Sequence, residues 1–310
     1  MAVVQEAVTG VIPKERYLLE RERVLGSLML APAVLYIVAL VGFPFFFALY
    51  LSMTDATVGH PYGSFVGLKN FLDIVQSPLF LKALKNTFVF TIISQVIVLV
   101  LAKVLALALA GDFPGKGVIQ FLILLPWVAP ISIGAIGWLW IFDSQYSIID
   151  WFLRALGVLG PNQWMFWLGK PTLAMGAVIT VHVWRMLPFA TVIILAGLTS
   201  IPQEILDAAD VDGAGFWRKL FQITIPLLLP IMSVAVLFGF IFTFTDMTVI
   251  YVLTRGGPYD STQVLASLAF LKGIVGGNLS VGAAISLFLF PLLLAAAILI
   301  LRFARRAEVM

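Results

Sequence analysis

Seven side chains in two apolar segments carry groups with which this chain could bind or move a polar solute. Four lie in the run 172–198 and three in the run 225–253, and in each set the spacing of three or four residues places them on one helical face. Their polar groups can form charge-assisted hydrogen bonds, and the phenylalanines offer flat apolar surface. The residues are His182, Arg185, Met186 and Phe189 in the first run, and Phe242, Thr243 and Asp246 in the second.

These polar residues have more than one interpretation, because ionisable groups inside a membrane are costly and are functional candidates by default. Arg185 and Asp246 can form a buried ion pair that fixes the register of two helices. Alternatively, the two faces line a translocation path, where the rings contact sugar C–H groups and the polar groups bind hydroxyls. A proton relay through His182, Arg185 and Asp246 is a further alternative. Gln95, in another apolar run, can line such a path or bond a neighbouring helix.

The composition indicates that these segments cross a membrane. Hydrophobic residues make up 61% of the 310 residues and charged residues 11%, and the mean hydropathy is +1.06. These values are typical of an integral membrane protein. The absence of cysteine excludes disulfides and thiolate metal sites, and two separated histidines do not suggest a metal cluster. The small net charge of +3 gives no reason to expect nucleic acid as a partner.

Six apolar runs are long enough to span a bilayer as helices, which takes about 20 residues. The first is too long for the core of a cleaved signal peptide, so we expect it to remain as a helix. Pro130 and Pro188 lie well inside their runs, where proline kinks a helix. The expected spans are 27–52, 86–110, 118–142, 172–198, 225–253 and 279–301.

An even number of spans places both termini on one side of the membrane. Basic residues in 1–26 and in 302–310 abut the first and last spans, which predicts that this side is the cytoplasm. One of the connections expected outside, 143–171, carries three tryptophans. An interfacial aromatic belt explains them, and a ligand platform is the alternative. They are Trp151, Trp164 and Trp167.

A charged break, residues 201–230, interrupts the apolar second half of the chain. Its charged residues cannot lie in hydrocarbon, so it is expected to project into water. Pro202 favours a helix start before 203–211, and Gly213 and Gly215 permit a sharp turn into a second helix. Five of its charged residues fall within 13 positions and are Asp207, Asp210, Asp212, Arg218 and Lys219.

The pattern D-A-A-x-x-D-G-A in this break, followed by Phe221, Ile223 and Pro226, resembles the E-A-A loop of permease subunits of bacterial ABC importers. In that family the loop forms a coupling helix that docks on the ATPase subunit. The family usually has glutamate where this chain has aspartate at 207. The resemblance implies a coupling role for Asp207, Ala208, Ala209, Asp212, Gly213 and Ala214.

Two further motifs resemble the carbohydrate-uptake, maltose-type branch of the family: F-V-G-L-x-N-F from Phe65 and L-T-x-G-G-P from Leu253. In that branch the sugar site lies on the two helices that correspond to 172–198 and 225–253, so the resemblance implies that the seven residues named first contact substrate. The maltose-type pattern uses neutral amides there, whereas this chain is more charged. Arg185 would suit a phosphate ester as well as a pair of hydroxyls.

The resemblance implies an all-α type I ABC importer permease in the bacterial inner membrane, with six transmembrane helices and a cytoplasmic coupling helix. We expect a cytoplasmic segment 1–26, a membrane domain 27–301 with the coupling loop 201–224, and a cytoplasmic tail 302–310. The chain is expected to be no enzyme. The expected partners are membrane lipid, a second permease, an external solute-binding protein that delivers a sugar-like substrate, and two ATPase subunits that bind ATP and Mg²⁺. A polyol or glycerol-phosphate solute, an ion-coupled transporter and a membrane scaffold are the alternatives.

Overall fold

The computed structural model describes residues 22–308, and the side chains of residues 25–305. The described residues form helices and loops, with two isolated β-bridges and no strand. The chain divides into two units, Met1–Tyr50 and Leu51–Met310. Most of the expected cytoplasmic segment 1–26 and the end of the tail 302–310 lie outside the described residues.

The first unit contributes one long apolar helix. The helix α1 (Glu22–Ile37), a π-helical turn η2 (Val38–Gly42) and α2 (Phe43–Ser52) follow one another without a break. The 28 residues from Leu25 to Ser52 are long and apolar enough to cross a membrane. This agrees with the expected first span, and it follows from a run that contains no charged residue.

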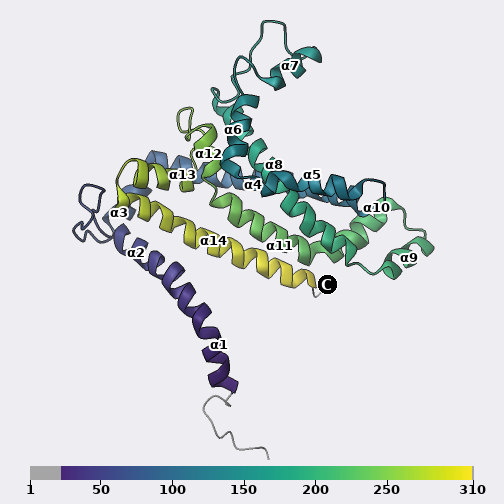
Figure 1. The fold of residues 1–310 in the computed structure, drawn as a ribbon, viewed down its shortest axis with the longest axis horizontal. Coiled ribbons are helices and arrows are strands. Elements are labelled where there is room, and N and C mark those ends of the chain that lie inside the picture. The colour runs from purple at the N-terminus through teal and green to yellow at the C-terminus, as the bar shows by residue number, and fades with distance from the viewer. Residues whose placement is uncertain (1–21, 309–310) are drawn as a thin grey trace, which may run out of the picture. The chain divides into compact units, whose positions relative to one another are not determined.

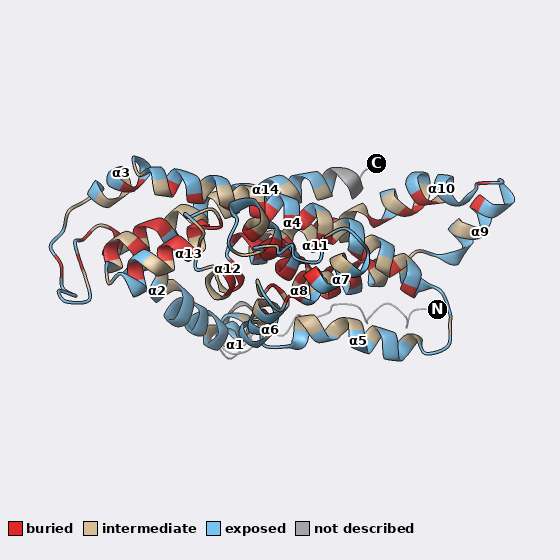
Figure 2. Cartoon of the chain, turned by 90° about the horizontal axis from the view of Figure 1, so that it is seen from above, coloured by how far each residue is buried: buried red, intermediate tan, exposed pale blue. Residues whose placement is uncertain are grey.

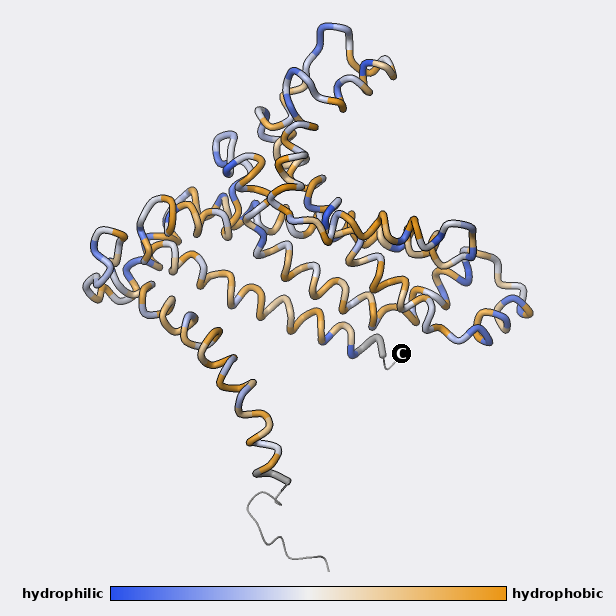
Figure 3. The backbone as a smooth tube through the Cα atoms, in the orientation of Figure 1, coloured by the Kyte–Doolittle hydropathy of each residue, from blue (hydrophilic) through white to orange (hydrophobic). Residues whose placement is uncertain are grey.

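The second unit is built on four long helices (Figure 1): α4 (Pro78–Ala110), α8 (Pro171–Thr199), α11 (Ile225–Phe244) and α14 (Leu279–Glu308). The helix α4 packs along α8, and α11 packs against α4, α8 and α14. Buried residues gather in the middle of this bundle (Figure 2). The exposed surface of the long helices is also apolar, while polar residues concentrate in the loops at their ends (Figure 3). Such a surface is suited to contact with lipid.

The expected third span, 118–142, is broken. It forms α5 (Lys116–Val128) and α6 (Ile131–Ile141), whose axes are bent by 96°. The break falls at Ala129 and Pro130, where Ala129 is extended at φ −65° and ψ 142°. Proline has no N–H for the helix ladder and disfavours helical geometry in the residue before it. The sequence predicted a kink at Pro130 but not a turn near a right angle.

The expected fifth span, 225–253, is wrong at both ends. The helix begins earlier, because α10 (Phe216–Lys219) and the π-helical turn η3 (Leu220–Thr224) lead directly into α11. It ends at Phe244, and α12 (Thr248–Leu253) follows as a separate short helix. The expected second span also starts earlier, at Pro78, whereas α8 and α14 begin close to the expected positions.

Short helices occupy the two ends of the bundle. The helix α9 (Gln203–Val211) lies with α10 at one end, and α3 (Lys69–Val75) lies with α13 (Leu265–Phe270) at the other (Figure 1). The helix α13 continues into a π-helical turn, η4 (Leu271–Val275). A further helix, α7 (Ile148–Ala155), belongs to the connection between α6 and α8.

Candidate functional site

The two predicted helical faces meet at His182 on α8. Its Nδ1 lies 2.9 Å from Asp246 Oδ2, and its Nε2 lies 2.9 Å from the hydroxyl oxygen of Thr243. The imidazole is fully buried, and Phe90 packs against it edge to face at 4.9 Å between ring centroids. Residues of the two predicted faces are therefore in contact, and the histidine links α8 to the end of α11.

Asp246 is saturated with hydrogen bonds. Its Oδ1 accepts from the backbone N–H groups of Thr248 at 2.8 Å and Val249 at 3.4 Å, which are orphan donors at the start of α12. Its Oδ2 faces both His182 and Arg185, whose Nη1 lies 3.5 Å away. This helix cap explains why the fifth span stops at Phe244.

Gln95 on α4 bonds a neighbouring helix, which settles the alternative left open by the sequence. Its Nε2 donates to the Thr243 hydroxyl oxygen at 2.9 Å, and that hydroxyl lies 2.7 Å from the Gly239 carbonyl. A Cβ on Gly239 would lie 2.7 Å from Gln95 Oε1, so glycine permits this approach. We call Gln95, His182, Thr243, Asp246 and Arg185 the His182 network. It joins α4, α8 and α11 through buried polar contacts.

Arg185 differs from the other polar members because 27% of its side-chain surface is accessible. The guanidinium lies 5.9 Å from the ring centroid of Trp127, within reach of a cation–π interaction. One nitrogen faces Asp246, and an arginine has five N–H donors in all. Arg185 is thus the charged group of the network with surface left to meet a solute.

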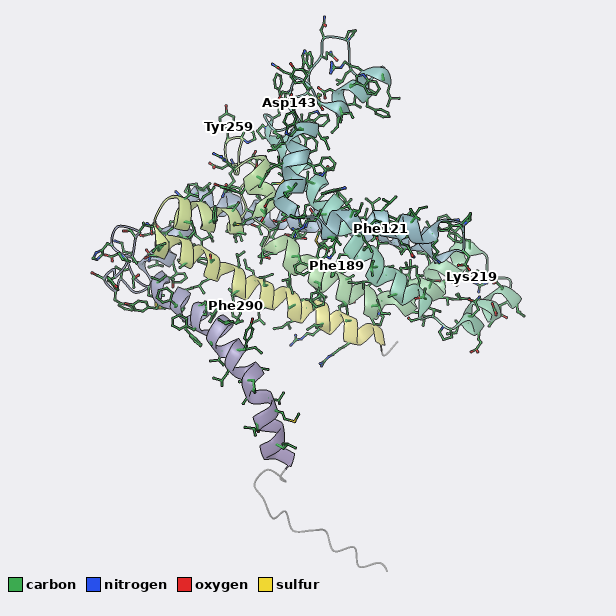
Figure 4. The ribbon with its side chains drawn as sticks, viewed as in Figure 1. Phe121, Asp143, Phe189, Lys219, Tyr259 and Phe290 are labelled. Carbon is green, nitrogen blue, oxygen red and sulfur yellow. The ribbon has the colours of Figure 1, made fainter. Side chains whose placement is uncertain are left out.

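Aromatic rings lie on the same side of the network as Arg185. Phe189 and Phe242 are in contact at 5.7 Å between centroids, and Trp127 stacks on Phe189 at 4.8 Å. Phe238 extends the group, 6.3 Å from Phe242. We call these four rings the aromatic cluster; Figure 4 labels Phe189 within the bundle. Trp127 and Phe238 were missed in the sequence, although Phe238 stands one helical turn before Phe242.

Burial divides the seven predicted site residues. Met186 is 1% exposed and belongs to the hydrophobic core. The three polar residues His182, Thr243 and Asp246 are also buried. Phe242 is 40% exposed, whereas Phe189 and Arg185 are partly buried. In this conformation four of the predicted site residues are buried and can only support the others: His182, Thr243, Asp246 and Met186. The remaining three have accessible surface: Arg185, Phe189 and Phe242.

The predicted coupling segment has the expected helix–turn–helix form. Gly213 turns the chain at φ +71°, a left-handed conformation that glycine adopts without strain, and the Ala214 N–H bonds to the Ala209 carbonyl at 2.9 Å. Lys219, labelled in Figure 4, bonds Asp210 across the turn at 2.5 Å. Most of the predicted coupling residues lie on α9 or its turn, and Ala209 and Ala214 are the buried ones. The set is Asp207, Ala208, Ala209, Asp212, Gly213 and Ala214.

The tryptophans of the 143–171 connection have separate roles. Buried Asp150 accepts from Trp167 Nε1 at 2.7 Å, so this ring holds the connection together. Trp151 and Trp164 line an open cavity of about 980 Å³. At the start of the connection, backbone N–H groups of Tyr146 and then Gln145 lower the pKa of the exposed Asp143 carboxyl. Among the residues with described positions, no group of three or more His, Cys, Asp or Glu could hold a metal ion.

Comparison with known proteins gives consistent matches. Residues 102–309 match a family described as binding-protein-dependent transport system inner membrane component. The chain is 34% identical over 285 residues to the trehalose/maltose transport system permease protein MalF of Thermococcus litoralis, covering 92% of this chain and 95% of that protein. It is 31% identical over 289 residues to the sulfoquinovosyl glycerol transport system permease protein SmoG of Agrobacterium fabrum, covering 93% and 92%.

A solved structure shares the fold. A chain from the crystal structure of a bacterial ABC transporter involved in the import of the acidic polysaccharide alginate superposes with a TM-score of 0.78. The match covers 93% of this chain and 97% of that chain at 20% identity. The overall helical arrangement is therefore one that an ABC importer adopts.

Proposed function

Because the chain belongs to the family of binding-protein-dependent transport system inner membrane components, we propose that it imports a sugar or sugar-like solute through the surface formed by Arg185 and the aromatic cluster. The chain is a multi-pass permease subunit of an ABC importer, and it is a transport component and not an enzyme. Membership of this family argues against the two alternatives from the sequence, an ion-coupled transporter and a membrane scaffold.

The observation that carries the substrate proposal is the pairing of an accessible guanidinium with flat apolar rings. Aromatic faces stack on the C–H face of a sugar, and guanidinium N–H groups bind paired hydroxyls or an anionic group. The His182 network holds Arg185 in place through Asp246 Oδ2, 3.5 Å from Nη1. A side chain held before binding loses less conformational entropy when the solute arrives.

The substrate is either a neutral saccharide or a saccharide-like solute with an anionic group. By their names, one relative transports trehalose and maltose, and another transports sulfoquinovosyl glycerol. Arg185 is compatible with both, and equally with a polyol or a glycerol-phosphate solute. A screen of ligands on the cognate solute-binding protein distinguishes these classes, because that protein selects what reaches the permease.

The proposed machinery includes subunits beyond this chain. A second permease completes the path, and two ATPase subunits bind ATP and Mg²⁺ and dock on the coupling loop 201–224. Both termini then lie in the cytoplasm, with the membrane domain 27–301 between the segment 1–26 and the tail 302–310. Closure of the ATPase pair opens the path to the outside, the binding protein delivers solute, and ATP hydrolysis resets the subunits.

An uptake assay with Arg185 variants tests the substrate surface. In the assembled complex, we expect Arg185→Gln to lower solute uptake at least tenfold, because hydrogen bonds from a charged donor are lost. Arg185→Lys should retain part of the uptake, because lysine keeps the positive charge but lacks the planar guanidinium group that donates two parallel hydrogen bonds. The control is Arg154→Gln, which alters an arginine over Trp164 in the 143–171 connection.

Thermal unfolding of the same variants in detergent separates a lost contact from a lost fold. Arg185→Gln should unfold within a few degrees of the parent. Normal uptake in this variant would refute the proposed substrate surface.

A further inference from the structure

A groove with charged edges lies at the α3 and α13 end of the bundle. The charged edges come from α3 and the turn η4, while the start of α4, the start of α14 and Leu268 of α13 also line the cavity, which measures about 280 Å³. Its floor is apolar and comes from residues of a second hydrophobic core. The floor residues are Ile74, Phe80, Leu268 and Ile285.

Two opposite charges line this groove without a partner. Asp73 comes from α3 and Lys272 from η4, and both are exposed. Neither side chain forms a hydrogen bond or an ion pair with any described residue. Beside them Asn278 uses its Oδ1 to accept from the Val281 N–H at 3.0 Å, which leaves its amide NH₂ as a donor. The groove therefore offers one anion, one cation and one neutral donor above apolar surface.

The walls of the groove are fixed by close packing. A Cβ on Gly273 would lie 3.0 Å from the Gly282 Cα, so the η4 backbone, which carries Lys272, runs directly against α14. Phe288 of α14 contacts Phe71 of α3 at 5.7 Å and Phe80 of α4 at 4.9 Å between centroids. Lys272 and Asp73 therefore lie on elements whose backbones are fixed by packing against α4 and α14.

The position of the groove along the spanning helices is the level at which lipid headgroups are expected. The helices α4 and α14 begin at Pro78 and Leu279 and are both candidate membrane spans. The groove includes Leu79 and Val281, in the first turns of these two helices. First turns of spanning helices lie where hydrocarbon gives way to the polar interface.

We propose that this groove binds a phospholipid with a primary ammonium headgroup, of phosphatidylethanolamine type. Lys272 and the Asn278 amide would bind the phosphate, and Asp73 would accept from the ammonium N–H groups. The lipid chains would cover Leu79 and Val281, which are partly exposed. A phosphatidylcholine headgroup has no N–H to donate, and an anionic phosphatidylglycerol headgroup leaves Asp73 without a cation.

Native mass spectrometry of the purified importer complex, titrated with each of the three lipids, tests this proposal. We expect saturable binding of phosphatidylethanolamine that is at least tenfold tighter than that of phosphatidylcholine. Asp73→Asn should weaken phosphatidylethanolamine binding about tenfold and leave phosphatidylglycerol binding unchanged. Lys272→Gln should weaken the binding of both lipids, because both carry the phosphate.

Two matched variants serve as controls. Lys85→Gln removes an exposed lysine from α4 outside the groove, and Asp260→Asn removes an exposed carboxylate at a left-handed position, φ 55°, that asparagine tolerates. Both should bind all three lipids as the parent does. Parental affinity of the Asp73→Asn and Lys272→Gln variants for phosphatidylethanolamine would overturn the proposal. So would unchanged lipid binding together with weakened association of the solute-binding protein, which would make the groove a protein contact.

Discussion

At the scale of single residues, the polar groups inside the bundle divide into supporting and accessible ones. Asp246 caps α12 and bonds the imidazole of His182, while Gln95 bonds Thr243 from a third helix. Without water in the surroundings, each of these groups needs such a partner. Arg185 alone of this network combines a charge with accessible surface in the described structure. The ion-pair and solute-path interpretations of the sequence are therefore compatible, because different atoms serve each purpose.

Replacing Asp246 should affect folding more than substrate binding. Asp246→Ala removes the cap of α12 and leaves His182 and Arg185 without their carboxylate. Leaving a buried donor without its acceptor costs about 1–3 kcal/mol. We expect a clear fall in the thermal unfolding temperature of the detergent-purified protein and low yield in the membrane. Asp143→Asn is the control, since that carboxyl is exposed. Equal unfolding temperatures of Asp246→Ala and the parent would contradict this role.

At the scale of elements, helix contact in this protein depends on small residues and on breaks. The right-angle turn at Pro130 ends α5 and lets Trp127, three residues earlier, stack on Phe189 of α8. The cap at Asp246 separates α11 from α12 in a similar way. Gly239 allows the amide of Gln95 to reach Thr243. The positions where local helix geometry changes are thus the positions that form the site.

A pair of glycine substitutions tests this view of helix packing. Gly239→Ala places a Cβ 2.7 Å from Gln95 Oε1, whereas a Cβ on Gly176 of α8 meets nothing within 4 Å. We expect Gly239→Ala to destabilise the protein by about 1–3 kcal/mol, the usual cost of overpacking. Gly176→Ala should be neutral or slightly stabilising, because alanine favours helix. Thermal unfolding of the two variants in the same detergent gives the comparison, and equal stability would show that Gln95 moves aside freely.

At the scale of the whole molecule, the proposed solute surface and the proposed coupling segment lie in different parts of the second unit. Figure 1 shows α9 and α10 at one end of the bundle, and α10 is continuous with α11, which carries Phe242. A displacement of α9 and α10 by an ATPase subunit can therefore reach the aromatic cluster along one helix. The π-helical turn η3 lies on this route, and such turns often occur at functional positions.

Gly213 offers a test of this coupling. Its φ of +71° is strained for a β-branched residue, although a Cβ there meets nothing within 4 Å. In reconstituted complexes, we expect Gly213→Val to lower solute uptake at least tenfold while ATP hydrolysis continues. Gly215→Val is the matched control, because Gly215 has an ordinary φ of −66° and equally open surroundings. Uptake and ATPase rates measured together report the coupling, and parental uptake in Gly213→Val would exclude it.

The sequence by itself determined the class of protein, most of the spans and the helix–turn–helix form of the segment after Ile201. These features follow from local properties of the sequence: the length of the apolar runs, the absence of charged residues from them, and the glycines at turns. The helical spacing that grouped Arg185 with Phe189 is local as well. Only the tertiary structure decided which polar groups satisfy one another, where the third span turns, and that Trp127 joins Phe189. Those outcomes depend on partners far apart in the sequence, such as Gln95 and Thr243, which are 148 positions apart. The low polarity inside the bundle favours pairing of buried donors with acceptors, and helix packing decides which groups meet.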